Sequence, residues 1–470
     1  MLMKMNFVIL GAGSVGFQLA KYLISQNNNV VLIEKELDKA KHAANVLDCM
    51  VINEQGNNIE TLKKAGINKA DYFISVTDSD EVNMIACSLV ASEFKVPHKI
   101  ARIRNIDYSG TRVLQQPILG IDYFVNPEIE TARAIIRAVE GGAVSDIVYF
   151  EKSSLQMRSI TVNDSSLLRD QCIEEIKRTI QINFLVAVIL RENEYIIPHG
   201  YSVVKENDKL YLIATAENFE KIFSQIGKGR MELKKIVLIG GDRVSVYVAE
   251  HFLEKKKKDL SIFGRLLHYL KPVKKRKINI IDSDYDNCKL LADRFPEAMI
   301  FNSDISDEGF SEEEELAGAD LVIAITDNQE FNIVNAVYAK SVGAGRTMVL
   351  VNKSNYVHIA SSLGIDVAVS QIESMVNSIL KYIRKSNIRS VYSISGGKVE
   401  VLELAVEKRS RTIGKKIKEL KLPRQTLIIS VTRGDTQIIP DGELIIESGD
   451  YIIVIARKES VARIEEIFTS

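Results

Sequence analysis

The chain has 470 residues, too many for one ordinary hydrophobic core, so a prior of about 100–200 residues per domain predicts three or four units. Its 61 basic and 62 acidic side chains nearly cancel and its apolar content is that of a globular protein, so composition argues against disorder and gives no reason to expect a nucleic-acid partner. The four cysteines are scattered without disulfide or zinc spacing, and we find neither a secretory signal nor an apolar run of the about 20 residues that span a bilayer, so we expect a cytoplasmic chain that does not itself cross a membrane.

A glycine fingerprint follows the first predicted strand. Strand F-V-I-L runs directly into G-A-G-S-V-G at 11–16, and a helical stretch follows. In this setting Gly11 permits the tight turn, Gly13 lets backbone amides approach a pyrophosphate, and Gly16 lets helix and strand pack closely. Because the positive amino end of the helix then faces the phosphates, we expect a nucleotide here. The predicted contacts are Gly11, Ala12, Gly13, Ser14, Val15 and Gly16.

An acidic residue ends the second predicted strand. Glu34 lies about twenty residues beyond the fingerprint, where a carboxylate accepts hydrogen bonds from the adenosine ribose and repels a 2′-phosphate. This favours NAD(H) or an adenine nucleotide over NADP. A glycine turn without any ligand is the alternative.

Further candidates lie at the carboxyl ends of later strands, where ligands bind in doubly wound folds. Asn57 follows the third strand and either contacts the ligand or belongs to a plain turn. Val76 and Thr77 close the fourth strand, and we expect Thr77 both to meet the nucleotide and to cap the next helix. Arg102 ends the fifth strand, where its guanidinium pairs with a phosphate or with a surface carboxylate.

The second half of the chain repeats the first. T-D-S-D-E-V-N at 77–83 recurs as T-D-N-Q-E-F-N at 326–332, and each half ends in a similar stretch of short strands and turns. Strands that alternate with helices are typical of parallel α/β sheets, whereas the turn-rich ends are typical of small α+β units. The predicted fold class is therefore α/β, with two tandem Rossmann-like lobes at 1–125 and 233–355, each followed by a small α+β lobe, at 145–229 and 387–470.

A basic insertion at 254–277 has no counterpart in the first half. Its lysine-rich flanks enclose the apolar stretch L-S-I-F-G-R-L-L-H-Y-L. Such a segment either lies on anionic lipid or forms a solvated loop with one short helix.

The chain lacks a recognisable catalytic apparatus. No histidine or lysine stands at a strand end beside an acidic partner in a substrate-like second domain, as hydride transfer would require. We therefore predict a regulator and not an enzyme. An NAD-dependent oxidoreductase, supported by the fingerprint, is the main alternative. A redox-sensing transcription factor is a second alternative, but no segment outside the repeats has room for a helix-turn-helix.

Taken together, G-A-G-S-V-G, Glu34, T-D-S-D-E-V-N-M-I-A-C and K-I-A-R-I-R resemble the TrkA family, the peripheral regulatory subunits of Trk potassium-uptake systems. The similarity covers nearly the whole chain. It implies tandem RCK (KTN) domains, each a Rossmann lobe with a small carboxyl-terminal lobe. It also implies a homotetramer that forms a ring of eight such units on the cytoplasmic face of the membrane, beneath a channel subunit of the TrkH or TrkG type.

The resemblance implies NAD(H), ATP or ADP as ligands at 11–15, Glu34, Asn57, Val76, Thr77 and Arg102. In the second copy it points to Asp282 at the ribose position, and to Asp304 and Thr326.

Two departures weaken the transfer from the family. The second fingerprint reads G-G-D-R-V-S, so Asp242 replaces the glycine that approaches phosphate and Ser245 replaces the packing glycine. A carboxylate at that position opposes an anion. In the first copy, Ser14 stands where relatives often carry a longer polar or basic side chain, so the preference between NAD(H) and ATP stays open.

Overall fold

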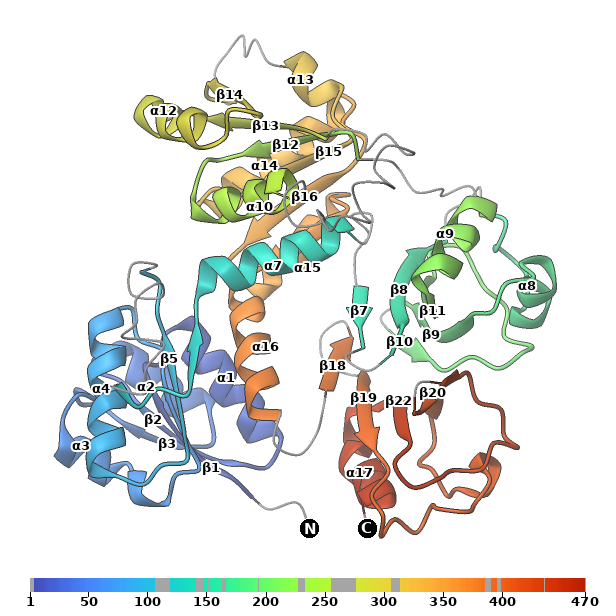
Figure 1. The fold of residues 1–470 in the computed structure, drawn as a ribbon, viewed down its shortest axis with the longest axis horizontal. Helices are drawn as coiled ribbons and strands as arrows, with labels where there is room; N and C mark the ends of the chain where they lie inside the picture. The colour runs from blue at the N-terminus through green and yellow to red at the C-terminus, as the bar shows by residue number, and fades with distance from the viewer. Residues whose placement is uncertain are drawn as a thin grey trace, which may run out of the picture.

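The computed structural model describes residues 4–105, 119–140, 147–150, 153–162, 166–192, 194–226, 233–254, 276–305, 313–384, 390–394, 399–434 and 436–469. They form two larger and two smaller lobes (Figure 1). Most of the insertion expected at 254–277, residues 255–275, lies outside the described residues. Among the described helices, none combines the length and apolar character needed to cross a bilayer.

The first lobe is a parallel six-stranded sheet in the order β3-β2-β1-β4-β5-β6. The strands are β1 (Asn6–Leu10), β2 (Asn29–Ile33), β3 (Met50–Ile52), β4 (Tyr72–Ser75), β5 (His98–Arg102) and β6 (Tyr123–Val125). Its helical elements are α1 (Ser14–Ser25), α2 (Leu37–Val46), α3 (Ile59–Lys64), η1 (Ile67–Lys69) and α4 (Asp80–Glu93). The strand order reverses between β1 and β4, which places a ligand crevice at their carboxyl ends.

The second lobe repeats this sheet in the order β14-β13-β12-β15-β16-β17, again all parallel. The strands are β12 (Lys235–Ile239), β13 (Lys277–Asp282), β14 (Met299–Asn302), β15 (Leu321–Ala324), β16 (Thr347–Val351) and β17 (Val367–Ser370). The helices are α10 (Arg243–Glu254), α12 (Tyr285–Arg294), α13 (Glu313–Ala317), α14 (Gln329–Ser341) and α15 (Ser354–Ser362). The predicted pair of Rossmann-like lobes is confirmed; β17 lies beyond residue 355, where the sequence placed the lobe's end.

Two helices exchange places between the large lobes. Helix α7 (Pro127–Glu140) follows the last strand of the first lobe but packs on α10, and α16 (Gln371–Arg384) follows the last strand of the second lobe but packs on α1 (Figure 1). Accordingly, Ile135 belongs to the core of the second lobe and Ile379 to the core of the first. The lobes cannot separate without exposing these side chains, each of which contributes about 1.5–3 kcal/mol when fully buried.

The small lobes are antiparallel five-stranded sheets in the orders β10-β9-β11-β8-β7 and β18-β19-β22-β20-β21, which confirms their predicted α+β character. The first contains β7 (Ile147–Tyr149), β8 (Leu155–Thr161), α8 (Ile173–Thr179), β9 (Leu185–Arg191), β10 (Glu194–Ile196), β11 (Lys209–Thr215) and α9 (Ala216–Gln225). The second contains β18 (Ser390–Ile394), β19 (Val399–Ala405), η3 (Ile417–Glu419), β20 (Thr426–Arg433), β21 (Thr436–Ile438), β22 (Tyr451–Arg457), η4 (Lys458–Ser460) and α17 (Val461–Thr469).

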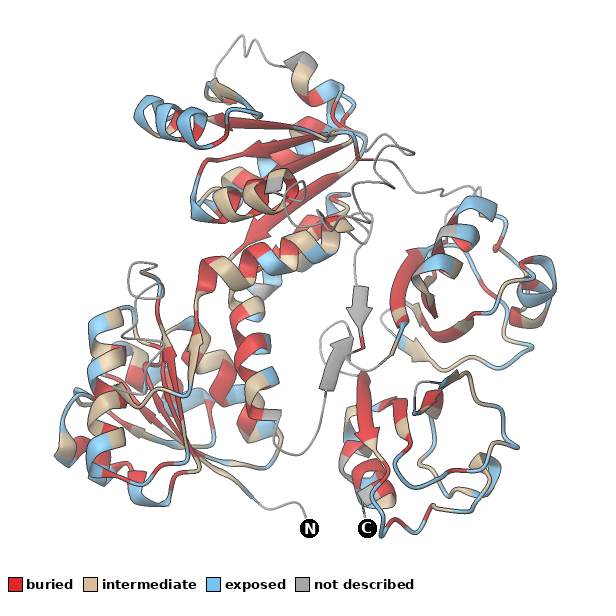
Figure 2. Ribbon diagram, in the orientation of Figure 1, coloured by how far each residue is buried: buried red, intermediate tan, exposed pale blue. Residues whose placement is uncertain are grey.

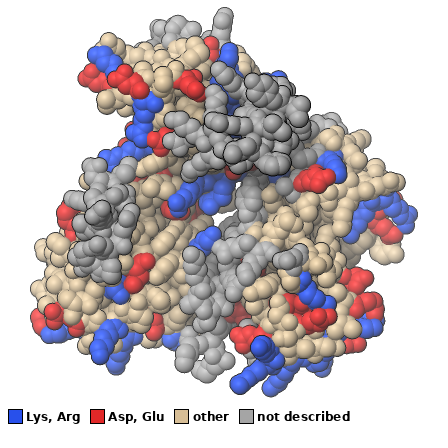
Figure 3. Space-filling model, viewed as in Figure 1, with Lys and Arg blue, Asp and Glu red and all other residues tan. Residues whose placement is uncertain are grey.

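The two small lobes share one core. Met157 and Tyr211 of the first lobe cluster with Val401 and Ile453 of the second. Figure 2 shows buried residues concentrated in the strands of the large lobes and at the facing small-lobe sheets. On the face seen in Figure 3, the described acidic and basic side chains are interspersed, so the balanced composition is also a balanced surface on that side.

Candidate functional site

The first crevice is shaped by glycines with different tasks. Gly11 has φ +102°, a conformation that favours glycine, and its N–H donates to the carbonyl of Ile33 (2.8 Å). A Cβ on Gly16 would lie 1.9 Å from the carbonyl oxygen of Gly11, so close packing of helix on strand requires glycine there. A Cβ on Gly13 would meet nothing within 4 Å. Gly13 is therefore dispensable for the fold and faces open space at the helix amino end.

The amino end of α1 offers free donors to an anion. Gly13 is the N-cap, and within the described first turn no side chain caps the helix and no residue is acidic. The first backbone N–H groups of a helix have no partner within it, and the helix dipole adds positive potential at this end. The predicted phosphate position thus has the expected donors.

Glu34 is buried beside this loop, with 6% of its surface exposed. Its Oε2 accepts from the N–H of Ala12 (2.7 Å) and its Oε1 from the N–H of Glu36 (2.9 Å). A carboxylate has about four acceptor positions, so capacity for ribose hydroxyls remains. Sequence reasoning missed Asn53, whose amide donates to the carbonyl of Glu34 (2.8 Å) and anchors this strand end. Its place directly after β3 was the available signal.

Asn57 is exposed on the segment that follows β3. Its neighbour Asn58 has the structural task, since the Asn58 side chain caps α3 by accepting from the N–H of Glu60 (2.8 Å). The described contacts therefore bring Glu34 to the fingerprint but leave Asn57 at the rim.

The T-D-S-D-E-V-N motif forms a strand-end clamp, a set of hydrogen bonds that joins the ends of two neighbouring strands. Asn83 is fully buried, and its Oδ1 accepts from the backbone N–H (2.9 Å) and the hydroxyl (2.8 Å) of Thr77. Its Nδ2 donates to the carbonyls of Thr77 (3.1 Å) and Arg102 (2.9 Å), joining the ends of β4 and β5. Sequence reasoning missed this role of Asn83, although its recurrence in the repeat was a signal.

The expectation that Thr77 caps the next helix is wrong. Ser79 is the N-cap of α4, and its hydroxyl accepts from the N–H of Val82 (3.2 Å). The reason is register: the N-cap lies immediately before the first helical residue, Asp80, so Thr77 stands two positions too early. The backbone of Thr77 and of its buried neighbour Val76 still lies against Gly11, and the Val76 side chain lies against Gly16.

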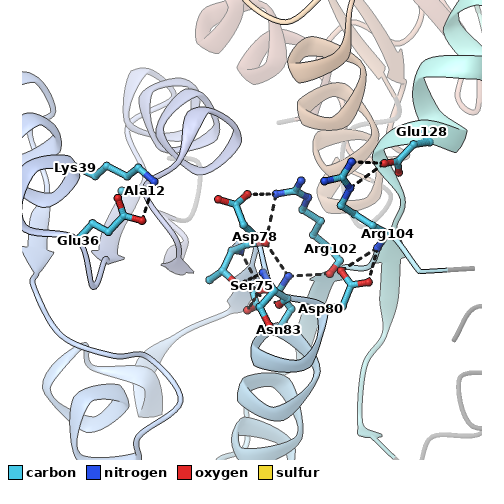
Figure 4. A network of polar contacts seen from close by, with 12 residues as sticks. Ala12, Glu36, Lys39, Ser75, Asp78, Asp80, Asn83, Arg102, Arg104 and Glu128 are labelled. Carbon is cyan, nitrogen blue, oxygen red and sulfur yellow. Dashed lines mark hydrogen bonds and ion pairs between the residues drawn. The ribbon is translucent and has the colours of Figure 1, made fainter. Parts of the chain in front are cut away.

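Two arginines at the end of β5 point in different directions (Figure 4). Arg102 extends to Asp78, with 2.8 Å between Nη1 and Oδ1, and its Nε finds no partner among the described residues. Arg104 extends to Glu128 on α7, with 2.8 Å between Nη2 and Oε1. Asp78 is 85% exposed, so an anionic ligand would compete with an easily displaced carboxylate for Arg102.

The second crevice has the same glycine turn as the first but a different residue at the position where a phosphate would approach. Gly240 has φ +100°, and Asp282 accepts from the N–H of Gly241 (2.6 Å), as Glu34 does in the first copy. Ser245 is buried, and its hydroxyl donates to the carbonyl of Gly240 (2.5 Å), which accommodates the larger residue at the packing position. Burial, together with the charges of Asp327 and Asp282, raises the pKa of Asp242 to about 6.

The three candidates of the second copy come together in one cavity. Asp282, Asp304 and Thr326 line it along with Gly240. Thr326 is held by Asn332, which repeats the clamp of the first lobe: Oδ1 accepts from the N–H (2.9 Å) and hydroxyl (2.7 Å) of Thr326. The duplicated motif therefore has the same structural task in both lobes.

Comparison with known proteins identifies the family. The TrkA-N domain model matches residues 7–127 and 236–371, and the TrkA-C domain model matches 157–227 and 401–469. The chain belongs to the TrkA family. A Trk system potassium uptake protein TrkA homolog from Methanosarcina mazei is 30% identical over 470 residues, which is 99% of this chain and 100% of the relative. TrkA of Halomonas elongata is 27% identical, covering 99% and 98% of the two chains.

Solved structures share the fold of this TrkA-family chain. The GsuK channel bound to NAD has a TM-score of 0.56 at 18% identity, covering 99% of this chain and 79% of that one. The GsuK RCK domain has a TM-score of 0.55 at 18% identity, covering 99% and 95%. These likenesses confirm the duplicated Rossmann and small-lobe architecture.

Proposed function

We propose that this TrkA-family chain is a regulatory, non-catalytic subunit of a potassium transporter that responds to NAD(H) or an adenine nucleotide in its first crevice. The observation that carries the proposal is the uncapped amino end of α1 facing open space at Gly13, with buried Glu34 beside it at the ribose position. Family membership supports the process, because the relatives are named as Trk system potassium uptake proteins. The GsuK channel is described as bound to NAD, which supports the ligand class.

The ligand's effect would pass through the exchanged helices. An anion that takes Arg102 from Asp78 perturbs the end of β5, and two residues further Arg104 holds Glu128 on α7. The carbonyl of Arg104 also accepts from Arg243 at the start of α10 (3.4 Å). Because α7 belongs to the core of the second lobe, a shift at the first crevice is transmitted to the other lobe. A ligand moves such an equilibrium only through unequal affinity for its two states.

The proposal also covers how the chains assemble and which membrane protein they bind. Helices α14 and α15 both pack on β16, and exposed apolar side chains lie on them or directly after them: Val334 on α14 (64% exposed), Ile359 on α15 (43%) and Leu363 directly after α15 (52%). Exposed apolar residues gathered on neighbouring helices favour a protein contact. We propose that such contacts join four chains into a ring of eight RCK units on the cytoplasmic face of the membrane, beneath a channel subunit of the TrkH or TrkG type.

The test is calorimetric titration of the purified chain with NADH, ADP and ATP. Gly13→Asp puts a carboxylate where a phosphate would approach, and since a Cβ at Gly13 meets nothing, the fold should survive. We expect that variant to lose binding at least tenfold. Asn45→Asp adds the same charge at an exposed position of α2 and should bind as the original chain does. Unchanged affinity in Gly13→Asp would refute the assigned crevice.

A second measurement separates a regulator from an enzyme. NADH absorbance is followed while the chain is incubated with a panel of carbonyl and hydroxyl metabolites. We expect binding without turnover. Sustained oxidation of NADH by the chain, abolished in Gly13→Asp, would replace the regulatory proposal with catalysis.

A further inference from the structure

The second crevice holds a cavity on its nucleoside side. It is a small hollow, lined by residues at the carboxyl ends of β12, β13, β14 and β15 and by Phe331 of α14. Ile281, Ile305 and Phe331 supply apolar walls, while Asp282 and Asp304 supply carboxylates. This side of a Rossmann crevice receives the adenosine half of a nucleotide.

The phosphate side of the same crevice carries a negative charge. Asp242 stands at the position of Gly13, outside the described lining of the cavity, and lies close enough to Asp327 and Asp282 for their charges to act on its carboxylate. In the first crevice the Gly13 position is open and the first turn of α1 has no acidic residue, and Asp78, the counterpart of Asp327, is paired with Arg102.

The neighbouring arginine does not cancel this charge within the crevice. The Arg243 guanidinium reaches across to the carbonyl of Arg104 in the first lobe. Asp327 and Asp282 add further negative charge around Asp242, and their repulsion is among the causes that raise the pKa of Asp242. At neutral pH the carboxylate is still mostly ionised, so an incoming phosphate meets a negative charge that the first crevice does not have at the Gly13 position.

We propose that the second crevice binds an uncharged adenine nucleoside and rejects its phosphorylated forms. Asp282 accepts from the ribose hydroxyls, since its Oδ2 is already fixed by the N–H of Gly241 (2.6 Å) and a carboxylate accepts several hydrogen bonds. Asp304, two residues after β14, would accept from an exocyclic amino group, and Phe331 and the two isoleucines would lie against the ring. The proposed selectivity is a property of the second crevice and is separate from the nucleotide response proposed for the first.

A cation is a less suitable occupant. Across the described residues, no group of three or more His, Cys, Asp or Glu side chains is arranged to hold a metal ion. Both carboxylate oxygens of Asp282 accept from backbone N–H groups, those of Gly241 and Asp284, which orients this side chain for hydrogen bonding.

The test uses the full chain in two forms. In the original chain, with the first crevice saturated by NADH, equilibrium dialysis with labelled adenosine should show about one adenosine retained per chain. In Gly13→Asp, which removes the first crevice from the titration, calorimetry should show adenosine binding at least tenfold tighter than ADP. Absence of adenosine binding in both forms, or ADP binding as tight as adenosine in Gly13→Asp, would overturn the proposal.

Two variants built on Gly13→Asp assign the selectivity. Asp242→Gly removes the opposing carboxylate and should strengthen ADP binding at least tenfold while changing adenosine binding less than threefold. Asp304→Asn should weaken adenosine at least tenfold. Adding Asp293→Asn, an exposed change on α12, serves as the matched control. If Asp242→Gly leaves ADP excluded, Asp242 is not the discriminating group and the proposal is wrong.

Discussion

Shortening a buried side chain of the exchanged helix α16 should destabilise the first large lobe, which the helix covers. It should not destabilise the second large lobe, which the helix follows in sequence. Ile379 is fully buried in the core of the first lobe, where it clusters with residues such as Leu19 and Leu23 of α1. Replacing it with alanine removes buried methyl groups and leaves a cavity, which costs about 2–5 kcal/mol. Since each 1.4 kcal/mol is about a factor of ten, local opening should become at least about 30-fold more frequent.

The assay is amide hydrogen exchange of Ile379→Ala. Faster exchange is expected in β1, β2 and α1, more than 300 residues earlier in sequence. Ile135→Ala on α7 is the matched control, because Ile135 is equally buried but belongs to the core of the second lobe. That variant should loosen β12 and β13 instead. If Ile379→Ala accelerated exchange mainly in β12 to β17, the exchanged packing would be wrong.

Three further predictions concern single positions. Gly16→Ala should lower stability by about 1–3 kcal/mol in urea titration, because the new Cβ overlaps the carbonyl of Gly11, whereas Gly13→Ala should change it by less than about 1 kcal/mol; equal losses would contradict this geometry. Asp450 is fully buried and paired twice with Arg433 (2.9 Å each), so Asp450→Asn should cost about 3–5 kcal/mol and loosen β20 and β22 in hydrogen exchange; a neutral result would show that the pair contributes little. The raised pKa of Asp242, about 6 against an ordinary 3.8, means that the folded state binds the proton more tightly, so the carboxylate lowers stability above about pH 6 and not below about pH 4. Asp242→Asn should therefore be more stable by about 1 kcal/mol at pH 7.5, a value discounted for solvent access, and the gain should vanish at pH 4; a gain that does not change with pH would exclude this cause.

The sequence determined the elements that depend on local chemistry. Neighbouring residues determine a glycine at φ +102°, a helix that begins directly after a strand, and the alternation of apolar runs with helical stretches. The two Rossmann-like lobes and their small partners could therefore be predicted. The duplication made the prediction stronger, since both copies obey the same pattern. That the fingerprint loop and Glu34 lie side by side also follows from local order, because β1, α1 and β2 are consecutive, whereas their contacts with a nucleotide stay a prediction.

The tertiary structure alone decided which distant residues meet. Nothing in the spacing of α7 or α16 says that each covers the other lobe, because an amphipathic helix fits either apolar surface and only the length and course of the connections choose between them. In the same way, Arg102 was recognisable as a guanidinium at a strand end, but its partner Asp78 and the clamp formed by Asn83 depend on how β4 and β5 lie side by side. The local sequence specifies the conformation of each element, whereas packing in the assembled core determines which distant elements make contact.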